Sequence, residues 1–203
     1  MKRAMSLDLL PKTIRQKYEC LEWNHGLAIL HSDFPREWDD IIEVLDDFEL
    51  RRSQVEVGGG NKSPVAKAID SAFYQRGWEE KSFNVTIQID EKEKDSPTHN
   101  IDCFKNKIML EIEWSNKDPF YDRDLNNFRL LHSLGAGSVG IIITKSEDLK
   151  DVFRGLGIYK KFGASTTWMG KLLPRIEGGG AAGCPLVVIG ICRSTYVDDV
   201  GTT

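Results

Sequence analysis

The chain has 203 residues and a formal net charge of −4, and 40% of its residues are apolar while 29% are charged. This length suits one substantial core, so we expect a single domain over residues 1–203. The sequence contains neither a run of about 18 apolar residues that would span a membrane nor the apolar core of a signal peptide, so we expect a cytoplasmic protein. The slight acidity argues against a protein that binds nucleic acid through its overall charge.

The first predicted elements are a strand and a helix. Residues 18–31 fit more than one structure, and within them we predict a strand from Leu27 to His31. A helix is predicted to begin at Pro35, because proline suits the first position of a helix. The apolar residues after it recur at helical spacing, and they are Trp38, Ile41, Ile42, Leu45 and Phe48.

A glycine-rich loop from Gly58 to Ser63 leads into a second helix. Ser63 is a good N-cap with proline directly after it, and the predicted buried residues are Val65, Ile69, Phe73 and Trp78. The loop has a superficial likeness to a phosphate-binding loop, but Asn61 and Glu56 stand where that motif requires glycines. A loop followed by an N-cap explains the segment better, and Lys62 could contact a DNA phosphate there.

The second half of the chain alternates strands with helices. We predict strands over residues 83–91, 101–104, 108–114, 138–145 and 186–191, with a charged loop at 91–100 and a turn at 105–107. Helices are predicted around residues 125–135, with Gly135 as the C-cap, and over 146–157, with Ser146 as the N-cap. This alternation implies an α/β fold in which helices flank a central mixed β-sheet.

Two glutamates stand on the predicted strand KIMLEIEWSN, residues 107–116, although strands are poor in acidic residues. Glu111 and Glu113 point to the same face, roughly 7 Å apart along the strand. The apolar residues of the other face are Ile108, Leu110, Ile112 and Trp114. A tight hairpin through the preceding turn would bring Asp102 close to Glu111 and create a cluster of three carboxylates.

Such a cluster is costly without a counter-charge, because like charges resist ionising together. A divalent cation removes this cost, and oxygen ligands without histidine or thiolate favour Mg²⁺, Mn²⁺ or Ca²⁺. A magnesium ion held by carboxylates and phosphate oxygens is typical of phosphoryl transfer. The alternative is an edge strand with an acidic face toward solvent, and the residues alone leave both open.

The segment IDCFKNKIMLEIEWSN, residues 101–116, resembles the active-site hairpin of the PD-(D/E)XK nuclease superfamily, whose pattern is an acid, a gap and then acid-x-lysine. Glu113 occupies the lysine position, a departure also found in BamHI, whereas BglII and BstYI have glutamine there. Further blocks between residues 35 and 192 resemble the BamHI/BglII/BstYI group of type II restriction endonucleases, in the same order. These blocks are EWDDIIEVL, SPVAKAIDSAF, RGWEEK, SVGIIIT, YKKFGAS and CPLVVIG.

The resemblance implies a restriction-endonuclease-like domain that cleaves double-stranded DNA with Mg²⁺, for which Mn²⁺ could substitute. Asp102 and Glu111 would bind the metal, and Glu113 would hold or orient the attacking water. Glu80 falls where BamHI-like enzymes place a further acidic residue of the site, and Glu79 is the alternative.

The same resemblance indicates which residues contact DNA. The first group follows the catalytic strand and consists of Ser115, Asn116, Lys117 and Arg123. The second group lies in FGASTTWMGK and consists of Ser165, Thr166 and Thr167. Asparagine can read adenine with two hydrogen bonds, and arginine or lysine commonly reads guanine. The alternative is that Ser115 and Asn116 cap the turn and that Arg123 pairs with Asp122 and Asp124.

Members of this group read palindromes centred on GATC, which implies a six-base site cut to leave four-base 5′ overhangs. The E-x-E pattern favours GGATCC, with AGATCT and RGATCY open. A palindrome implies a homodimer, for which we predict a face formed by the helix at Asp124 to Leu134 and the helix after Ser63. A cognate DNA methyltransferase would protect the same site in the cell. The alternatives are a structure-specific repair nuclease of the superfamily and a catalytically silent DNA-binding module.

Overall fold

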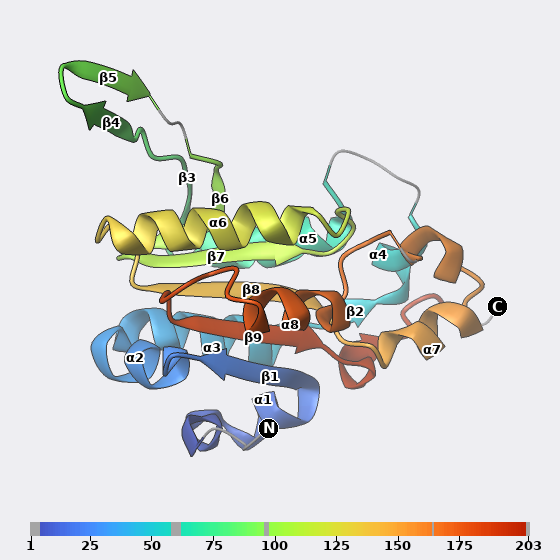
Figure 1. Ribbon diagram of the computed structural model, residues 1–203. Coiled ribbons are helices and arrows are strands. Elements are labelled where there is room, and N and C mark those ends of the chain that lie inside the picture. Colours follow the sequence, from blue (N-terminus) through green and yellow to red (C-terminus); the bar gives the residue numbers. More distant parts are fainter. Residues whose placement is uncertain (1–4, 58–61, 96–97, 164, 202–203) are drawn as a thin grey trace.

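A six-stranded mixed sheet forms the centre of the computed structural model, which describes residues 5–57, 62–95, 98–163 and 165–201 (Figure 1). In spatial order its strands are β1 (Tyr18–Trp23), β9 (Leu186–Ile191), β8 (Val139–Lys145), β7 (Ile108–Glu113), β6 (Ile101–Lys105) and β3 (Glu79–Lys81). β7, β8 and β9 are parallel, whereas β1, β6 and β3 are antiparallel to their neighbours. The predicted α/β fold with a central mixed sheet is confirmed.

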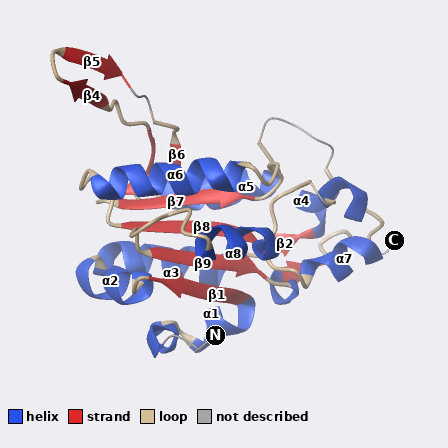
Figure 2. Cartoon of the chain, in the orientation of Figure 1, coloured by secondary structure: helices blue, strands red, loops and turns tan. Residues whose placement is uncertain are grey.

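Helices cover both faces of this sheet (Figure 2). One face packs against α1 (Lys12–Lys17), α2 (Gly26–Asp33), α3 (Pro35–Asp47) and α5 (Pro64–Tyr74), and the other against α6 (Phe120–Ser133) and α8 (Met169–Glu177). Strand alternation separates the two cores, since Ile108 and Leu110 of β7 face the first set of helices and Met109 faces the second. The shorter elements are α4 (Arg52–Glu56), α7 (Leu149–Gly155), β2 (Leu50–Arg51), β10 (Tyr196–Val197), η1 (Met5–Leu9), η2 (Tyr159–Phe162) and η3 (Arg193–Thr195).

Several helix ends coincide with their sequence signals. α3 begins at Pro35, and α5 begins directly after Ser63, whose Oγ accepts a hydrogen bond of 3.1 Å from the Ala66 N–H. α6 is followed by Gly135, whose φ of +71° is the left-handed conformation that glycine tolerates. Gly58 to Asn61 of the predicted loop lie outside the described residues. No helix in the described part of the chain is long and apolar enough to cross a membrane.

Three predictions of local structure are wrong. Residues 26–33 form a helix instead of a strand, because Leu27 and Leu30 are buried one turn apart, and a short apolar run fits either element. The predicted charged loop contains β5 (Lys92–Asp95), which pairs with β4 (Thr86–Ile89) in a hairpin that extends from the body (Figure 1). Ser146 does not cap α7, because its hydroxyl donates to Glu19 Oε2 at 2.6 Å.

The hairpin of β6 and β7 fixes the position of the acidic residues. Its turn uses Asn106 (φ +45°) and Lys107 (φ +71°), and two left-handed residues are the pattern of a type I′ turn. The strands pair Cys103 with Leu110, so the next residues in this register are Asp102 and Glu111. The predicted tight hairpin is therefore present.

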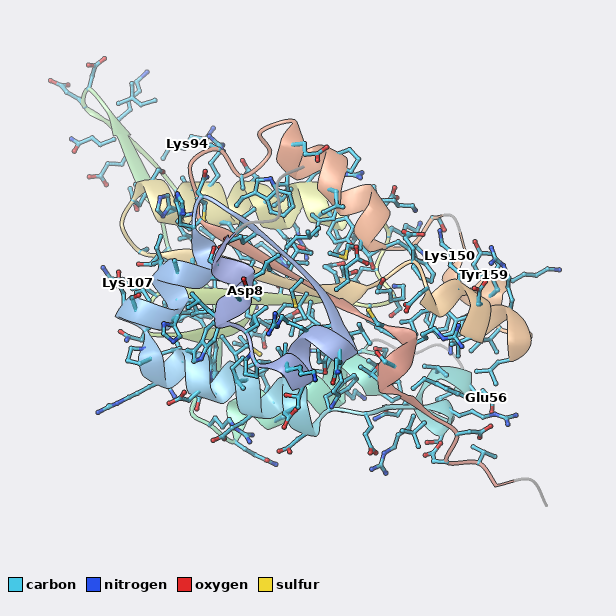
Figure 3. The ribbon with its side chains drawn as sticks, turned by 90° about the horizontal axis from the view of Figure 1, so that it is seen from below. Asp8, Glu56, Lys94, Lys107, Lys150 and Tyr159 are labelled. Atoms are coloured by element: carbon cyan, nitrogen blue, oxygen red, sulfur yellow. The ribbon has the colours of Figure 1, made fainter. Side chains whose placement is uncertain are left out.

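The turn of this hairpin and the helix α7 lie at opposite ends of the molecule. Lys107 marks the turn, while Lys150 of α7 and Tyr159 of η2 mark the far end (Figure 3). Because β7 runs away from its turn, Glu111 and Glu113 lie toward its C-terminal end. The starts of α5 and α6 lie near the same end of the strand (Figure 1), and residues from both starts line one cleft together with Asp102.

Candidate active site

The two glutamates of β7 lie inside the protein on the side of the sheet that α6 covers. Glu111 and Glu113 are each only 1% exposed, and β7 is a central strand between β6 and β8. An acidic edge strand that faces solvent is therefore excluded. Two carboxylates in this position lose most of their hydration, so neighbouring groups must compensate the buried charge.

Asp102 meets Glu111 across the hairpin, as the sequence predicts. The Asp102 backbone N–H donates to Glu111 Oε2 at 3.3 Å, and the Ile112 N–H donates to Asp102 Oδ2 at 2.9 Å. The other oxygen of Asp102 lies 3.8 Å from the Nζ of Lys62, which also contacts Asp70. Lys62 therefore places positive charge directly beside the acidic residues.

A third buried acid comes from the first turns of α6. Asp124 is fully buried (0% exposed), and its Oδ1 accepts hydrogen bonds from Arg123, at 3.1 Å from Nε and 2.9 Å from Nη2. The same Nη2 lies 3.9 Å from Glu113 Oε1. Asn116 Nδ2 donates to that glutamate oxygen at 3.0 Å. Arg123 and Asn116 thus hold the outer edge of the acidic cluster.

Burial raises the pKa of all three buried carboxyl groups. Burial and the negative charge of Asp124 raise the pKa of Glu111 well above its ordinary value and the pKa of Glu113 to about 9. Burial raises the pKa of Asp124 to about 6, although the positive charge of Arg123 acts in the opposite direction. In the absence of a cation, burial therefore favours the protonated form of Glu113, and a hydrogen bond with Asp124 favours it as well.

The carboxylates fit a divalent cation. When the carboxyl groups are ionised, Glu111 Oε1, Glu113 Oε2 and Asp124 Oδ2 have no hydrogen-bond donor among the described residues. Unpaired buried oxygens are costly, and hard cations such as Mg²⁺ and Mn²⁺ prefer carboxylate ligands. An ion bound here would stabilise charge on a phosphate and lower the pKa of a bound water.

A cleft of about 220 Å³ opens next to these carboxylates. Its lining includes Lys62 and Ser63 at the start of α5, Asp102 of β6, Asn116 after β7 and Arg123 of α6. Two basic side chains and the N-terminus of a helix beside Asp102 form an arrangement that can receive a phosphodiester.

The two segments predicted to contact DNA lie side by side. Backbone hydrogen bonds of 2.9 and 3.1 Å join residues 116–118 to residues 165–167. The exposed side chains among the predicted contacts are Ser115, Lys117 and Ser165. These three can therefore reach a ligand from one continuous surface next to the cleft.

The hydroxyls of Thr166 and Thr167 are used inside the protein, so Ser165 alone of the second predicted group has an exposed side chain. Thr166 is 8% exposed, and its hydroxyl donates to the carbonyls of Phe162 and Gly163, each at 3.1 Å. Thr167 is fully buried (0% exposed), and its hydroxyl accepts a hydrogen bond of 3.5 Å from Lys145 Nζ. Both residues fix the loop without offering a free hydroxyl.

Glu80 and Glu79 differ in their surroundings. Glu80 accepts a hydrogen bond of 3.1 Å from Asn100 Nδ2, and its charge acts on His99 at the rim of the cleft. Glu79 forms an ion pair of 3.2 Å with Lys81 on the exposed part of β3. Of the two, Glu80 is therefore the residue whose charge acts on a residue that lines the cleft.

Three residues of this region have no predicted site role. Asp124 enters the sequence-based analysis only as an ion-pair partner, although an acid on the apolar face of a helix, one turn from Phe128, is a signal for a special role. His99 carries no sequence signal. Lys145 ends the apolar strand β8 and is fully buried (0% exposed), where its Nζ contacts the carbonyl of Trp114.

A mixed sheet with converging carboxylates on a central hairpin, next to a cleft with basic walls, defines a metal-dependent nuclease. The chain matches the family described as restriction endonuclease BglII/BglIII over residues 18–191. It belongs to this family and is a type II restriction endonuclease, a hydrolase that cleaves DNA at specific sites and uses a divalent metal. A search among curated proteins found no match.

Proposed function

We propose that this enzyme cuts a six-base palindrome with GATC at its centre, with GGATCC as the first choice, and leaves four-base 5′ overhangs. The support for GATC is the resemblance of the ordered sequence blocks to BamHI, BglII and BstYI, including Ser115 and Asn116 after the catalytic strand. The support for a flanking G is Glu113, since the E-x-E pattern is that of BamHI. AGATCT and RGATCY are the alternatives.

The observation that supports metal-dependent cleavage at this site is the hydrogen bond between the Asp102 backbone and Glu111 beside a cleft. In our proposal these two residues hold Mg²⁺, or Mn²⁺ as a substitute, and Glu113 orients the attacking water. The bound ion supplies charge stabilisation at the scissile phosphate and acidifies the water. Lys62 offsets the charge of Asp102 and the incoming phosphate, and Glu80 completes the acidic set.

Base reading is assigned to the surface next to the cleft. Asn116 can form a bidentate hydrogen bond with adenine, and Lys117 and Arg123 can donate hydrogen bonds to guanine or phosphate. Ser115 and Ser165 add exposed hydroxyls from the two adjoining segments. The proposed DNA-contacting side chains therefore do not include Thr166 and Thr167, which are buried.

A palindromic site implies a two-fold symmetric homodimer of single-domain subunits. α5 and α6 both contact β7, from opposite faces of the sheet. They carry large exposed apolar side chains at or next to their ends, namely Tyr74 (39% exposed), Phe120 (37%) and Leu134 (56%). We assign the dimer interface to these residues, and in the cytoplasm a methyltransferase of the same specificity would protect the host DNA.

The test of the specificity is digestion of a sequenced plasmid with Mg²⁺, followed by end mapping and by a panel of duplexes that vary one base pair at a time. Discrete bands that depend on GATC are expected. Smears or nicks at branched DNA would indicate a repair nuclease, and cutting that ignores changes within GATC would remove the proposed specificity. Cutting that needs GATC but not a flanking G would remove only GGATCC.

Substitution of Asn116 tests the base reader within the same panel. Asn116→Ala should cost about 1–3 kcal/mol and relax discrimination at one symmetric pair of positions. Lys62→Ala is the matched comparison, because loss of a phosphate contact weakens all sequences alike and lowers the salt dependence of binding. Unchanged base discrimination in Asn116→Ala would exclude Asn116 as a reader.

A further inference from the structure

A second group of metal-binding side chains lies on the α6 side of Glu111. One ring nitrogen of His99 and one carboxylate oxygen each of Glu111 and Asp124 all lie within 4.8 Å of one another. Ligand atoms that share an ion at about 2.0–2.2 Å lie at most about 4.4 Å apart, so small side-chain rotations bring the three onto one ion. Within the described residues, the buried atom Glu111 Oε1 has no hydrogen-bond partner, and Asp124 Oδ2 has none when Glu113 is ionised, while Asp124 Oδ1 accepts from Arg123.

The helix α6 contributes to this group of side chains in two ways. It carries Asp124, and the Nδ2 of Asn127 (4% exposed) donates a hydrogen bond of 3.1 Å to the carbonyl of His99. Residues three positions apart lie on the same side of a helix, so Asp124 and Asn127 face His99 together. One rigid helix therefore supplies a ligand and fixes the loop that carries the imidazole, and such outer support is typical of metal sites.

We propose that His99, Glu111 and Asp124 bind a divalent transition ion such as Mn²⁺ or Zn²⁺, and that Glu111 is shared between this inner position and the position at Asp102. An imidazole nitrogen favours transition ions, whereas Mg²⁺ favours oxygen ligands. The two positions therefore prefer different metals. The role of the inner ion in DNA cleavage rests on the proposed function, but its binding does not require DNA.

The test measures metal binding to the whole protein without DNA. Mn²⁺ binding is followed by loss of the electron paramagnetic resonance signal of the free ion, and Mg²⁺ binding by calorimetry. Because Mn²⁺ can also occupy the position at Asp102, the wild type should bind two Mn²⁺ ions. His99→Asn should weaken binding of one of them about tenfold or more, because loss of even a supporting residue typically costs 10–100-fold. The same variant should leave Mg²⁺ binding unchanged, and Asp124→Asn should weaken Mn²⁺ binding as well.

Two matched variants control for the chemistry of the substitutions. His25→Asn changes a histidine at the start of α2 on the other face of the sheet, where asparagine tolerates the φ of +61°. Asp122→Asn changes the exposed neighbour of the site, which pairs with Arg175 at 2.9 Å. Both variants should bind Mn²⁺ as the wild type does.

Three results would overturn the inner site: no Mn²⁺ binding by the wild type, equal Mn²⁺ affinity in wild type and His99→Asn, or equal losses for Mn²⁺ and Mg²⁺ in that variant. Because His99 is partly exposed, its substitution should leave the fold intact even if Asp124→Asn unfolds the protein. Plasmid cleavage with Mg²⁺ is measured in parallel. If the enzyme cuts at specific sites but binds no Mn²⁺ at the inner site, only the inner site is excluded. If it binds Mn²⁺ at the inner site but does not cut at specific sites, only the proposed function is excluded.

Discussion

At the scale of single residues, the cost of burying charge decides what each carboxylate can do. Glu111 is bonded to the backbone of Asp102 through one oxygen, while its other oxygen has no partner among the described residues. A preorganised ligand of this kind loses little conformational entropy when a cation binds, because the protein has already ordered its side chain. The residue is therefore more suited to metal binding than to structural support.

Glu111→Ala and Asp102→Ala should each abolish cleavage, because each removes an oxygen ligand of the proposed metal. DNA affinity should hold or rise, since loss of a negative charge near phosphates does not weaken attraction. Cleavage is measured with Mg²⁺, and binding is measured by gel shift with Ca²⁺. Cutting by Glu111→Ala near the wild-type rate would show that the active site lies elsewhere.

Glu113 should make stability depend on pH when cations are removed. Burial raises its pKa from 4.5 to about 9 in the folded protein, so the folded state keeps a proton that the unfolded chain releases as pH rises. The stability of the wild type relative to Glu113→Gln should therefore fall between about pH 5 and 9, by at most about 1.4 kcal/mol per pH unit. Thermal unfolding in EDTA across this range measures it, and a constant difference between the two proteins would contradict the buried charge cluster.

At the scale of elements, a buried lysine joins the end of β8 to the end of β7. Lys145 Nζ contacts the Trp114 carbonyl and lies 5.2 and 5.1 Å from the rings of Trp114 and Trp168. Burial lowers its pKa from 10.5 to about 7. The lysine thereby fixes the point at which the catalytic strand passes into the loop that carries Asn116.

Lys145→Met should raise the unfolding temperature at and below neutral pH and lower the cleavage rate. A pKa lowered this far corresponds to roughly 5 kcal/mol of lost hydration, which exceeds the about 1–3 kcal/mol cost of an unpaired carbonyl. Activity should fall because the strand end loses its anchor. Lys150→Met, which changes a lysine 5.2 Å from Trp168, is the control. A less stable variant with full activity would contradict both expectations.

The hairpin of β6 and β7 could be predicted from sequence because its signals are local. Alternating apolar residues and a short turn bring Asp102 to Glu111 without information from distant segments. Residues 26–33 were assigned to the wrong element because their burial depends on packing against β8 and β9. The role of Asp124 depends on α6 lying over β7, and the burial of Thr166 depends on carbonyls of η2 and the following loop. These contacts leave no periodic pattern in the chain.

At the scale of the whole molecule, symmetry doubles the effect of a substitution in the proposed dimer interface. Each residue of a two-fold interface occurs twice, and burial of a leucine contributes about 1.5–3 kcal/mol. Leu134→Glu should therefore shift the protein toward monomers in analytical ultracentrifugation and reduce cleavage of the palindrome. Ile89→Glu, on the projecting β4–β5 hairpin and 64% exposed, is the control. A wild-type monomer that cuts both strands would exclude the assigned interface.

If Asn116 reads a base as we propose, its bond to Glu113 gives the enzyme a route to fidelity that does not depend on how tightly it holds DNA. An asparagine amide has two N–H donors and one acceptor, so one N–H can stay on Glu113 while the remaining groups face a base. A wrong base that displaces Asn116 then also displaces Glu113, and a shift of about 1 Å in such a group can cost about a hundredfold in rate. Incorrect sites would be bound and left uncut, so discrimination should be larger in kcat than in Kd.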